Sequence, residues 1–367
     1  MTGRETLREF TARFATAQEV SDWDTHVIAN PHGGDMLQSA SFADVKKHHG
    51  WKPVHLVHEP ADGSQPVYTL VLEKSVPGLG RLWYMVKGPA VETVEDLKGF
   101  TNATRNLVKQ HAKNVFLVKV EPVIPDSGEA RAALEQAGLK KTLIIQPNDH
   151  TAVLDTDRDP EEIMKGMQSN GRNKLRRAIR EEAPVELVEV NEENMRAMYA
   201  LMQTARQGQL NVTLRPFSYY SRFWGNFAKS GQGRLYFAYE DGEPSVGAFV
   251  VNYGPHATYK DGGSKPRRKQ RGDAHLVQWT AINDLISEHG IKDYDLCGTP
   301  PSDELKNEEH QFHGMGMFKT SFTKGTVVDY VGVWDQEINP TKVAIWNRIG
   351  EKVARQLWVR SRNEPFY

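Results

Sequence analysis

The apolar positions of this chain follow two periods, one of helices and one of strands. Near the N-terminus, Thr16 and Glu19 have the spacing of a capping box, and Val20, Trp23 and Val27 follow at helical intervals. Alternating and β-branched runs then predict three strands, a long helix and a buried strand: 54–59, 67–73, 81–89, 93–113 and 115–122.

The second half of the chain repeats this order. A basic helix around 170–182 is followed by further helices and then by three strand-like runs, 234–240, 246–253 and 257–262. The second half then ends with an apolar helix at 274–290 and a strand at 293–298. The repeat is one of structure, because the two halves share no obvious sequence.

This pattern predicts an α+β fold with two similar domains of ordinary size. The polar stretch after Asn148 suggests a first domain at 1–150 and a second at 151–325. Residues 326–367 would add a strand and an amphipathic helix.

Composition narrows the function. The 367 residues include 39% hydrophobic residues and carry a formal net charge of -1. We find no membrane-spanning apolar run and no signal peptide, and Cys297 is the single cysteine, so we expect a cytoplasmic protein. Near-neutral charge argues against a general nucleic-acid coat protein, so any phosphate binding must be local. The sequence also contains no GxxxxGK[ST], GxSxG, HExxH or CxxC motif.

Positive charge is concentrated in the stretch GGSKPRRKQRGDAHLVQW, which begins at Gly262. It lies between a predicted strand and a predicted helix, where helix amides and basic side chains together bind phosphate. Acyl-CoA N-acetyltransferases hold the cofactor pyrophosphate in this arrangement, although Lys269 stands where their pattern begins with Arg or Gln. A solvated loop is the alternative. The basic residues are Lys265, Arg267, Arg268, Lys269 and Arg271.

A second basic cluster occupies the predicted helix NGRNKLRRAIREE. Arg172, Arg176 and Arg180 share one face at helical spacing, with Lys174 and Arg177 nearby. It could be a solvated helix face, but two basic clusters in one half favour a long polyanion over a small nucleotide.

Three further side chains are candidates for chemistry. Arg215 and Tyr219 are four residues apart, so on a helix they would face one way and could hold a diphosphate; they could equally belong to the start of a core helix. Lys319, in the apolar stretch HGMGMFKTSF, could stabilise an oxyanion or simply extend from a half-buried helix to solvent.

Several stretches together resemble the Fem family of aminoacyl-tRNA-dependent peptidyltransferases, which build the peptide bridges of bacterial peptidoglycan. They run in the family's order and cover most of the chain: LQSASFADVKKHHGW, VKVEP, NKLRRAIR, LNVTLRPFSYYSRF, ATYKDGGS, AHLVQWTAINDLISEHGIKDYDLCG, MGMFKTSF and VDYVGVWD. The resemblance implies two tandem GNAT-type domains, with the last strand returning to the first domain. There are too few residues before Arg215 for the long coiled-coil arm of some members.

The resemblance also implies roles for individual residues. Lys46, Arg215 and Tyr219 match a site for the diphosphate of the precursor. Tyr259 matches a tyrosine near the muramyl peptide, and Gly332 a glycine lining the cleft. Glu121 stands where the family usually has aspartate, and Phe318 and Lys319 match the pair that meets the 3′ end of the tRNA.

The expected reaction is aminolysis of an aminoacyl ester by a stem-peptide amine, with Lys319 stabilising the oxyanion and Glu121 as a candidate base. The donor would be aminoacyl-tRNA, and the acceptor UDP-MurNAc-pentapeptide or lipid II. No cofactor or metal is expected, because the ester is already activated. Both basic clusters would face the tRNA, and the C-terminal helix could touch an anionic membrane or pack on the first domain.

Three other functions stay open at this point. The chain could be an acyl-CoA-dependent N-acyltransferase with the same fold. It could be a non-catalytic module that binds tRNA or wall precursors. It could also use aminoacyl-tRNA to modify a small metabolite or a lipid headgroup.

Overall fold

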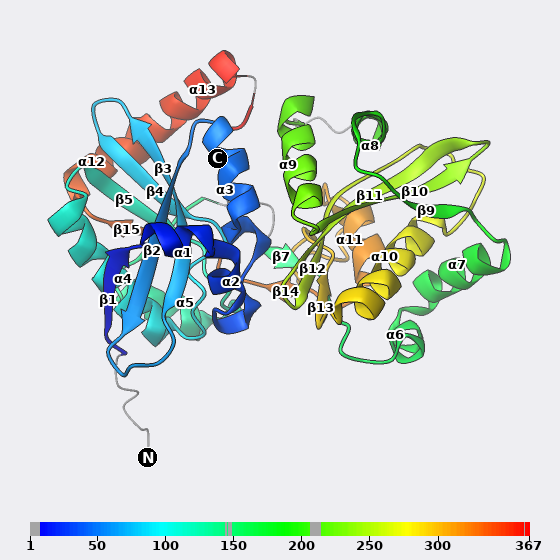
Figure 1. Ribbon diagram of the computed structural model, residues 1–367, viewed down its shortest axis with the longest axis horizontal. Coiled ribbons are helices and arrows are strands. Elements are labelled where there is room, and N and C mark those ends of the chain that lie inside the picture. Colours follow the sequence, from blue (N-terminus) through cyan, green and yellow to red (C-terminus); the bar gives the residue numbers. More distant parts are fainter. Residues whose placement is uncertain (1–7, 144, 146–148, 206–213, 363) are drawn as a thin grey trace. The chain divides into compact units, whose positions relative to one another are not determined.

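The computed structural model describes residues 8–143, 145, 149–205, 214–362 and 364–367 (Figure 1). The chain divides into two compact units. Unit 1 contains Met1–Gln146 and Tyr330–Tyr367, and unit 2 contains Pro147–Asp329. In the described residues, no helix has both the length and the apolar content needed to cross a bilayer.

Unit 1 is built on a seven-stranded sheet with the order β1-β2-β3-β4-β5-β15-β6. Its strands are antiparallel except for the pair β4 and β5, which is parallel and is joined by the crossover helix α4 (Val94–His111). The strands are β1 (Phe10–Phe14), β2 (Lys52–Pro60), β3 (Val67–Val76), β4 (Gly80–Met85), β5 (Val115–Val120), β6 (Lys140–Lys141) and β15 (Trp334–Glu337).

The remaining helices of unit 1 come from both ends of the chain. The predicted capping box is present: the Thr16 hydroxyl accepts from Glu19 N, and the Glu19 carboxylate accepts from Thr16 N. The helices are α1 (Ala17–Ser21), α2 (Trp23–Ile28), α3 (Ala40–His48), α5 (Gly128–Gln136), α12 (Pro340–Ile345) and α13 (Glu351–Arg362), with short 3₁₀ turns at Pro31–Gly33 and Met36–Gln38.

The C-terminal segment is not one continuous α-helix as its pattern predicts. A π-helical turn, Trp346–Gly350, separates α12 from α13. Trp346 and Glu351 are five residues apart and both are buried, at 0% and 8% exposure. The wider turn brings both side chains to the inner side, which an uninterrupted α-helix would not do.

Unit 2 has a six-stranded sheet with the order β8-β13-β12-β11-β10-β9 and a separate pair, β7 with β14. Here too one central pair, β12 with β13, is parallel and is joined by a crossover helix, α10 (Asp273–His289). The strands are β7 (His150–Thr151), β8 (Val153–Asp155), β9 (Val185–Val188), β10 (Gly233–Glu240), β11 (Glu243–Tyr253), β12 (His256–Ser264), β13 (Asp293–Asp295) and β14 (Val328–Asp329).

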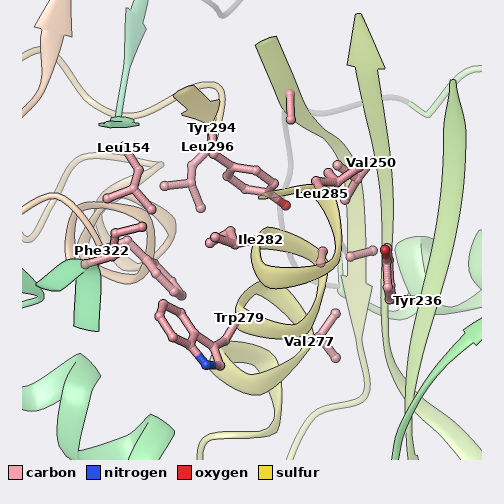
Figure 2. Packing of buried hydrophobic residues seen from close by; sticks show 14 of the residues in the cluster. Leu154, Tyr236, Val250, Val277, Trp279, Ile282, Leu285, Tyr294, Leu296 and Phe322 are labelled. Atoms are coloured by element: carbon pink, nitrogen blue, oxygen red, sulfur yellow. The ribbon is translucent and has the colours of Figure 1, made fainter. Parts of the chain in front are cut away.

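The core of unit 2 lies between this sheet and α10. Figure 2 shows Trp279 and Ile282 of α10 facing Phe322, with Tyr294 and Leu296 close by. These side chains are less than a tenth exposed, and apolar burial of this kind is the main stabilising contribution to folding. The other helices of the unit are α6 (Pro160–Gly166), α7 (Ser169–Arg180), α8 (Glu192–Ala205), α9 (Phe217–Lys229) and α11 (His313–Thr320).

Candidate active site

Lys319 is the buried centre of the candidate site in unit 2. It lies near the end of α11 and is 7% exposed. Its ammonium donates to the backbone carbonyls of Cys297 at 3.1 Å and Gly298 at 2.9 Å. Burial lowers the pKa of Lys319 below the usual lysine value, although Cys297 and Asp295 partly counteract it. An ammonium has three hydrogens, so these two bonds leave one for a substrate oxygen.

The backbone after β13 is bent so that both carbonyls face this lysine. Cys297 has a φ of 57°, in the left-handed region that only a minority of non-glycine residues adopt. The Asp295 carboxylate holds this conformation by accepting from Cys297 N at 2.6 Å, and the Thr151 hydroxyl donates to the same oxygen. Strained backbone conformations of this kind cluster at functional sites, although they also occur in turns.

A β-bulge in β12 brings Tyr259 to the same place. Tyr259 pairs with Val250 and Asp261 with Phe249, so Lys260 is the extra residue between them. The Lys319 ammonium lies 5.8 Å from the Tyr259 ring. Burial raises the pKa of Tyr259, and the Asp261 carboxylate raises it further, so this phenol stays protonated at neutral pH.

Gly262 makes room for the Tyr259 side chain. A Cβ at Gly262 would lie 1.6 Å from the Tyr259 hydroxyl oxygen, which is far inside van der Waals contact. The glycine therefore fixes where this hydroxyl can lie.

A chain of contacts connects the bulge to Arg215 and Tyr219. The Lys260 ammonium lies 3.3 Å from Asp261 and 5.1 Å from the Phe223 ring. The Phe223 ring stacks on Tyr219 at 6.4 Å, and the Arg215 guanidinium lies 4.5 Å from the Tyr219 ring. Burial lowers the pKa of Lys260, but Asp261 beside it raises the pKa above the usual range. The structure thus brings together Arg215, Tyr219, Tyr259 and Lys319.

Part of the basic loop is held by the protein's own carboxylates. Arg268 donates to both oxygens of Asp273 at 2.6 and 3.2 Å, and Lys269 pairs with Asp241 at 2.7 Å. The amides of Lys269 and Gln270 donate to one oxygen of Glu240 at 2.7 and 3.2 Å.

The place of a cofactor pyrophosphate in this loop is therefore already filled by negative charge. Asp273 is 2% exposed at the start of α10 and also accepts from Ala274 N at 2.7 Å. Lys265, Arg267 and Arg271 take part in none of the ion pairs of the described residues, and Arg267 and Arg271 are exposed.

The second basic segment, α7, packs directly on this loop. Gln270 donates to Glu181, just past the end of α7, at 2.7 Å, and a Cβ at Gly272 would lie 2.1 Å from the Lys174 carbonyl oxygen. On α7, Arg176 is exposed, whereas Arg172 donates to the Lys165 carbonyl at 2.7 Å. The two basic segments form one continuous part of unit 2.

A cavity of about 140 Å³ lies between α7, α10 and α11. Phe318 and Lys174 line it together with His275, which is 6% exposed. The Phe318 ring lies 4.9 Å from the imidazole of His275. Burial, with a smaller contribution from the Lys174 ammonium, lowers the pKa of His275 to about 4, so this imidazole is neutral at pH 7.

Three predicted site residues lie in unit 1. Glu121, just after β5, is 1% exposed; it accepts from the Tyr84 hydroxyl at 2.5 Å and lies 3.9 Å from the Lys87 ammonium. Lys46 of α3 is 2% exposed, whereas its neighbour Lys47 is exposed. Gly332 has a φ of 66° just before β15.

Four residues that contact these candidates were not indicated by the sequence: Lys260, Asp261, His275 and Lys87. The first two lie in the quoted stretch ATYKDGG, where two glycines inside a strand indicate a bulge or a close approach. His275 and Lys87 give no such signal, because their burial and their partners come from distant segments.

Comparison with known proteins relates this geometry to characterised folds. The model of the acetyltransferase (GNAT) domain family matches residues 168–310. The lipid II:glycine glycyltransferase of Staphylococcus aureus is 25% identical over 236 residues, which are 61% of this chain and 54% of that protein. The chain thus spans about half the length of the curated relatives that it matches.

Solved structures confirm the predicted fold class. A crystal structure of FemX matches with a TM-score of 0.75 at 18% identity, covering 92% of this chain and 99% of that one. The C-terminal domain of a putative lysylphosphatidylglycerol synthetase from Agrobacterium fabrum matches with a TM-score of 0.50 at 15% identity. The match covers 92% of this chain and 97% of that one. The α+β fold with two main sheets is therefore established, and the GNAT family match lies within unit 2.

Proposed function

Because this chain belongs to the Fem family, we propose that it moves an amino acid from aminoacyl-tRNA to the stem-peptide amine of a peptidoglycan precursor, UDP-MurNAc-pentapeptide or lipid II. The amine attacks the ester carbonyl carbon, an amide bond forms, and the bond to the ribose oxygen breaks. The amine loses a proton and the ribose hydroxyl regains one. Lys319 donates to the oxyanion that forms between these steps.

The filled basic loop is the observation that carries this choice of donor. An acyl-CoA enzyme needs free loop amides and a free helix N-terminus for the cofactor pyrophosphate. Here Glu240 accepts from the loop amides, and Asp273 occupies the start of α10 beside Arg268. A pyrophosphate would meet two carboxylates there, which argues against the acyl-CoA alternative despite the acetyltransferase family match.

The continuous basic part of unit 2 supports a tRNA donor. Arg267, Arg271 and Arg176 present exposed cations that suit a phosphate backbone recognised by shape. Lys174 reaches from this surface to the cavity that Phe318 lines. We assign the cavity to the 3′ end of the tRNA, next to the helix that carries Lys319.

The acceptor is assigned to the remaining site residues. Arg215 and Tyr219 would hold the precursor's diphosphate in unit 2, with Tyr259 beside the muramyl peptide. In unit 1, Lys46 and Gly332 would contact the precursor, and Glu121 would orient or deprotonate the attacking amine.

A transfer assay tests this function. Purified protein is mixed with a pool of radiolabelled aminoacyl-tRNAs and with UDP-MurNAc-pentapeptide or, in parallel, lipid II. We expect label to move to at least one acceptor. Acylation from acyl-CoA without any transfer from tRNA would overturn the proposal, and transfer to a lipid headgroup or small metabolite alone would reassign the acceptor.

Charge reversal tests the tRNA surface separately. Arg267→Glu with Arg271→Glu should weaken tRNA binding and lower the salt slope by about 2, one for each lost phosphate contact. Lys98→Glu with Lys229→Glu changes the same number of exposed charges outside both basic segments and should leave the slope unchanged. Equal tRNA affinity of both variants and the wild type would reject this surface.

A further inference from the structure

The C-terminal helices of unit 1 carry an uncovered apolar stripe. Figure 1 shows α12 and α13 along the outside of this unit, in orange to red. Five of the twelve exposed large apolar side chains of the described residues lie within residues 345–359. Four of them are spaced four residues apart, so they follow one side of the helices. They are Ile345 at 53% exposure, Ile349 at 60%, Val353 at 44% and Leu357 at 58%, and the fifth is Val359 at 48%.

The stripe is not needed to attach these helices to unit 1. Trp346 and Val343 are fully buried, and Glu351 accepts from the Tyr367 hydroxyl at 2.7 Å. The Trp358 ring lies 3.7 Å from the buried Lys74 ammonium. The inner side is therefore packed, and the apolar residues opposite it face solvent.

The same segment is strongly basic. Residues 340–362 contain six basic residues and one acidic residue, Glu351, which is 8% exposed and already bonded. None of the six forms an ion pair with a described residue, although the whole chain has a net charge of -1. The six are Lys342, Arg348, Lys352, Arg355, Arg360 and Arg362.

A cavity of about 220 Å³ lies beside the start of α12. Its lining includes three lysines, Lys109, Lys113 and Lys342, and no acidic side chain. Val115 and Phe116 contribute apolar walls. Lys342 is three residues before Ile345, so this positive cavity adjoins the apolar stripe. Its size and charge suit a phosphate headgroup.

We infer that α12 and α13 dock unit 1 on an anionic lipid surface. The stripe would enter the boundary between headgroups and acyl chains, while the basic residues contact lipid phosphates. A second copy of this chain is a poorer occupant, since a symmetric contact would place the same positive segments against each other. The inference rests on the surface of unit 1 and holds whichever acceptor the enzyme uses. With a lipid-linked acceptor, it would keep the enzyme at the membrane where that acceptor resides.

Vesicle co-sedimentation tests this surface without any enzymatic readout. Full-length protein is mixed with vesicles of phosphatidylcholine alone or with a third of phosphatidylglycerol. We expect binding to the anionic vesicles only, decreasing with salt. Lys352→Gln with Arg360→Gln removes two positive charges. Each lost charge should lower the vesicle affinity about fivefold, so the double variant should bind about 25-fold more weakly.

Apolar variants complete the experiment. Ile349→Ser with Leu357→Ser should abolish sedimentation, whereas Leu143→Ser with Leu187→Ser, 55% and 50% exposed, should bind as the wild type does. Equal binding of all variants, or no preference for anionic vesicles, would overturn the inference. So would a dimer in sedimentation velocity that dissociates only in the Ile349/Leu357 variant, because a second copy would then cover the stripe. Failure of the transfer assay would not affect these results.

Discussion

Replacing Lys319 by methionine separates the proposed chemical role of this ammonium from a structural one. The substitution keeps the unbranched shape and removes the charge that Cys297 and Gly298 hold. Loss of one oxyanion donor typically lowers kcat by about 10²–10³, or about 2.7–4 kcal/mol. We expect that loss in Lys319→Met, with little change in tRNA affinity.

The stability of this variant should change much less. Two hydrogen bonds from a charged donor contribute about 3–6 kcal/mol, taking about 1.5–3 kcal/mol for each. Burying an ammonium costs several kcal/mol, which the methionine avoids. The two effects largely cancel, so we expect the Tm to move by less than about 5 °C.

Lys119→Met is the matched control. Lys119 is a fully buried lysine of unit 1, paired with Asp335 at 2.8 Å and with Thr142 at 3.2 Å. Breaking such a pair costs about 3–5 kcal/mol, so this variant should lose stability but keep its kcat at low temperature.

Single-turnover transfer from labelled aminoacyl-tRNA measures the rate. Filter binding measures the tRNA affinity, and circular dichroism measures the Tm. A Lys319→Met enzyme with a kcat within threefold of the wild type would refute the role of Lys319 in stabilising the oxyanion. A loss of rate that only follows the loss of folded protein would refute it equally.

Three further predictions concern Lys319, Gly262 and Glu121. Burial lowers the pKa of Lys319, so the ammonium proton is present below that pKa and is lost as the pH rises through it. The transfer rate should therefore begin to fall at a pH below about 10.4, the usual lysine pKa. Lys319→Arg should remove this alkaline limb of the pH–rate profile. Gly262→Ala should displace Tyr259 and raise the KM for the acceptor about tenfold. Gly225→Ala is the control, because a Cβ there meets nothing within 4 Å, and its KM should not change. Equal KM values for the two variants would contradict the role of Gly262 in positioning Tyr259. Glu121→Gln should lower kcat less than about tenfold if the tRNA's own ribose hydroxyl accepts the proton, and a loss above about 100-fold would identify an essential base.

The α+β class could be predicted because it depends on local patterns. The runs 54–59 and 67–73 fall within β2 and β3, and the capping box at Thr16 is present. The predicted helix at 274–290 corresponds to α10, Asp273–His289. Periodicity and capping are properties of neighbouring residues, so they can be seen in the sequence.

The chemistry of the site depends on contacts that the sequence does not show. The carbonyls around Lys319 lie 21 and 22 residues before it and depend on the unusual φ of Cys297. Glu240 lies 29 residues before the loop amide that it binds. Because these carboxylate partners lie far away in the sequence, the sequence alone predicts a phosphate site in the basic loop. In the structure, two of its five cations are paired with carboxylates.

In the proposed reaction, most of the rate enhancement should come from substrate binding and positioning. An oxyanion contact contributes about 2.7–4 kcal/mol, whereas holding two reactants in register contributes about 7–11 kcal/mol. An aminoacyl ester is already activated, so positioning is the larger part of the barrier in the proposed reaction. Changes at Arg215, Gly262 or the exposed basic residues should therefore alter kcat as well as KM, because substrate contacts remote from the ester place its carbonyl beside Lys319.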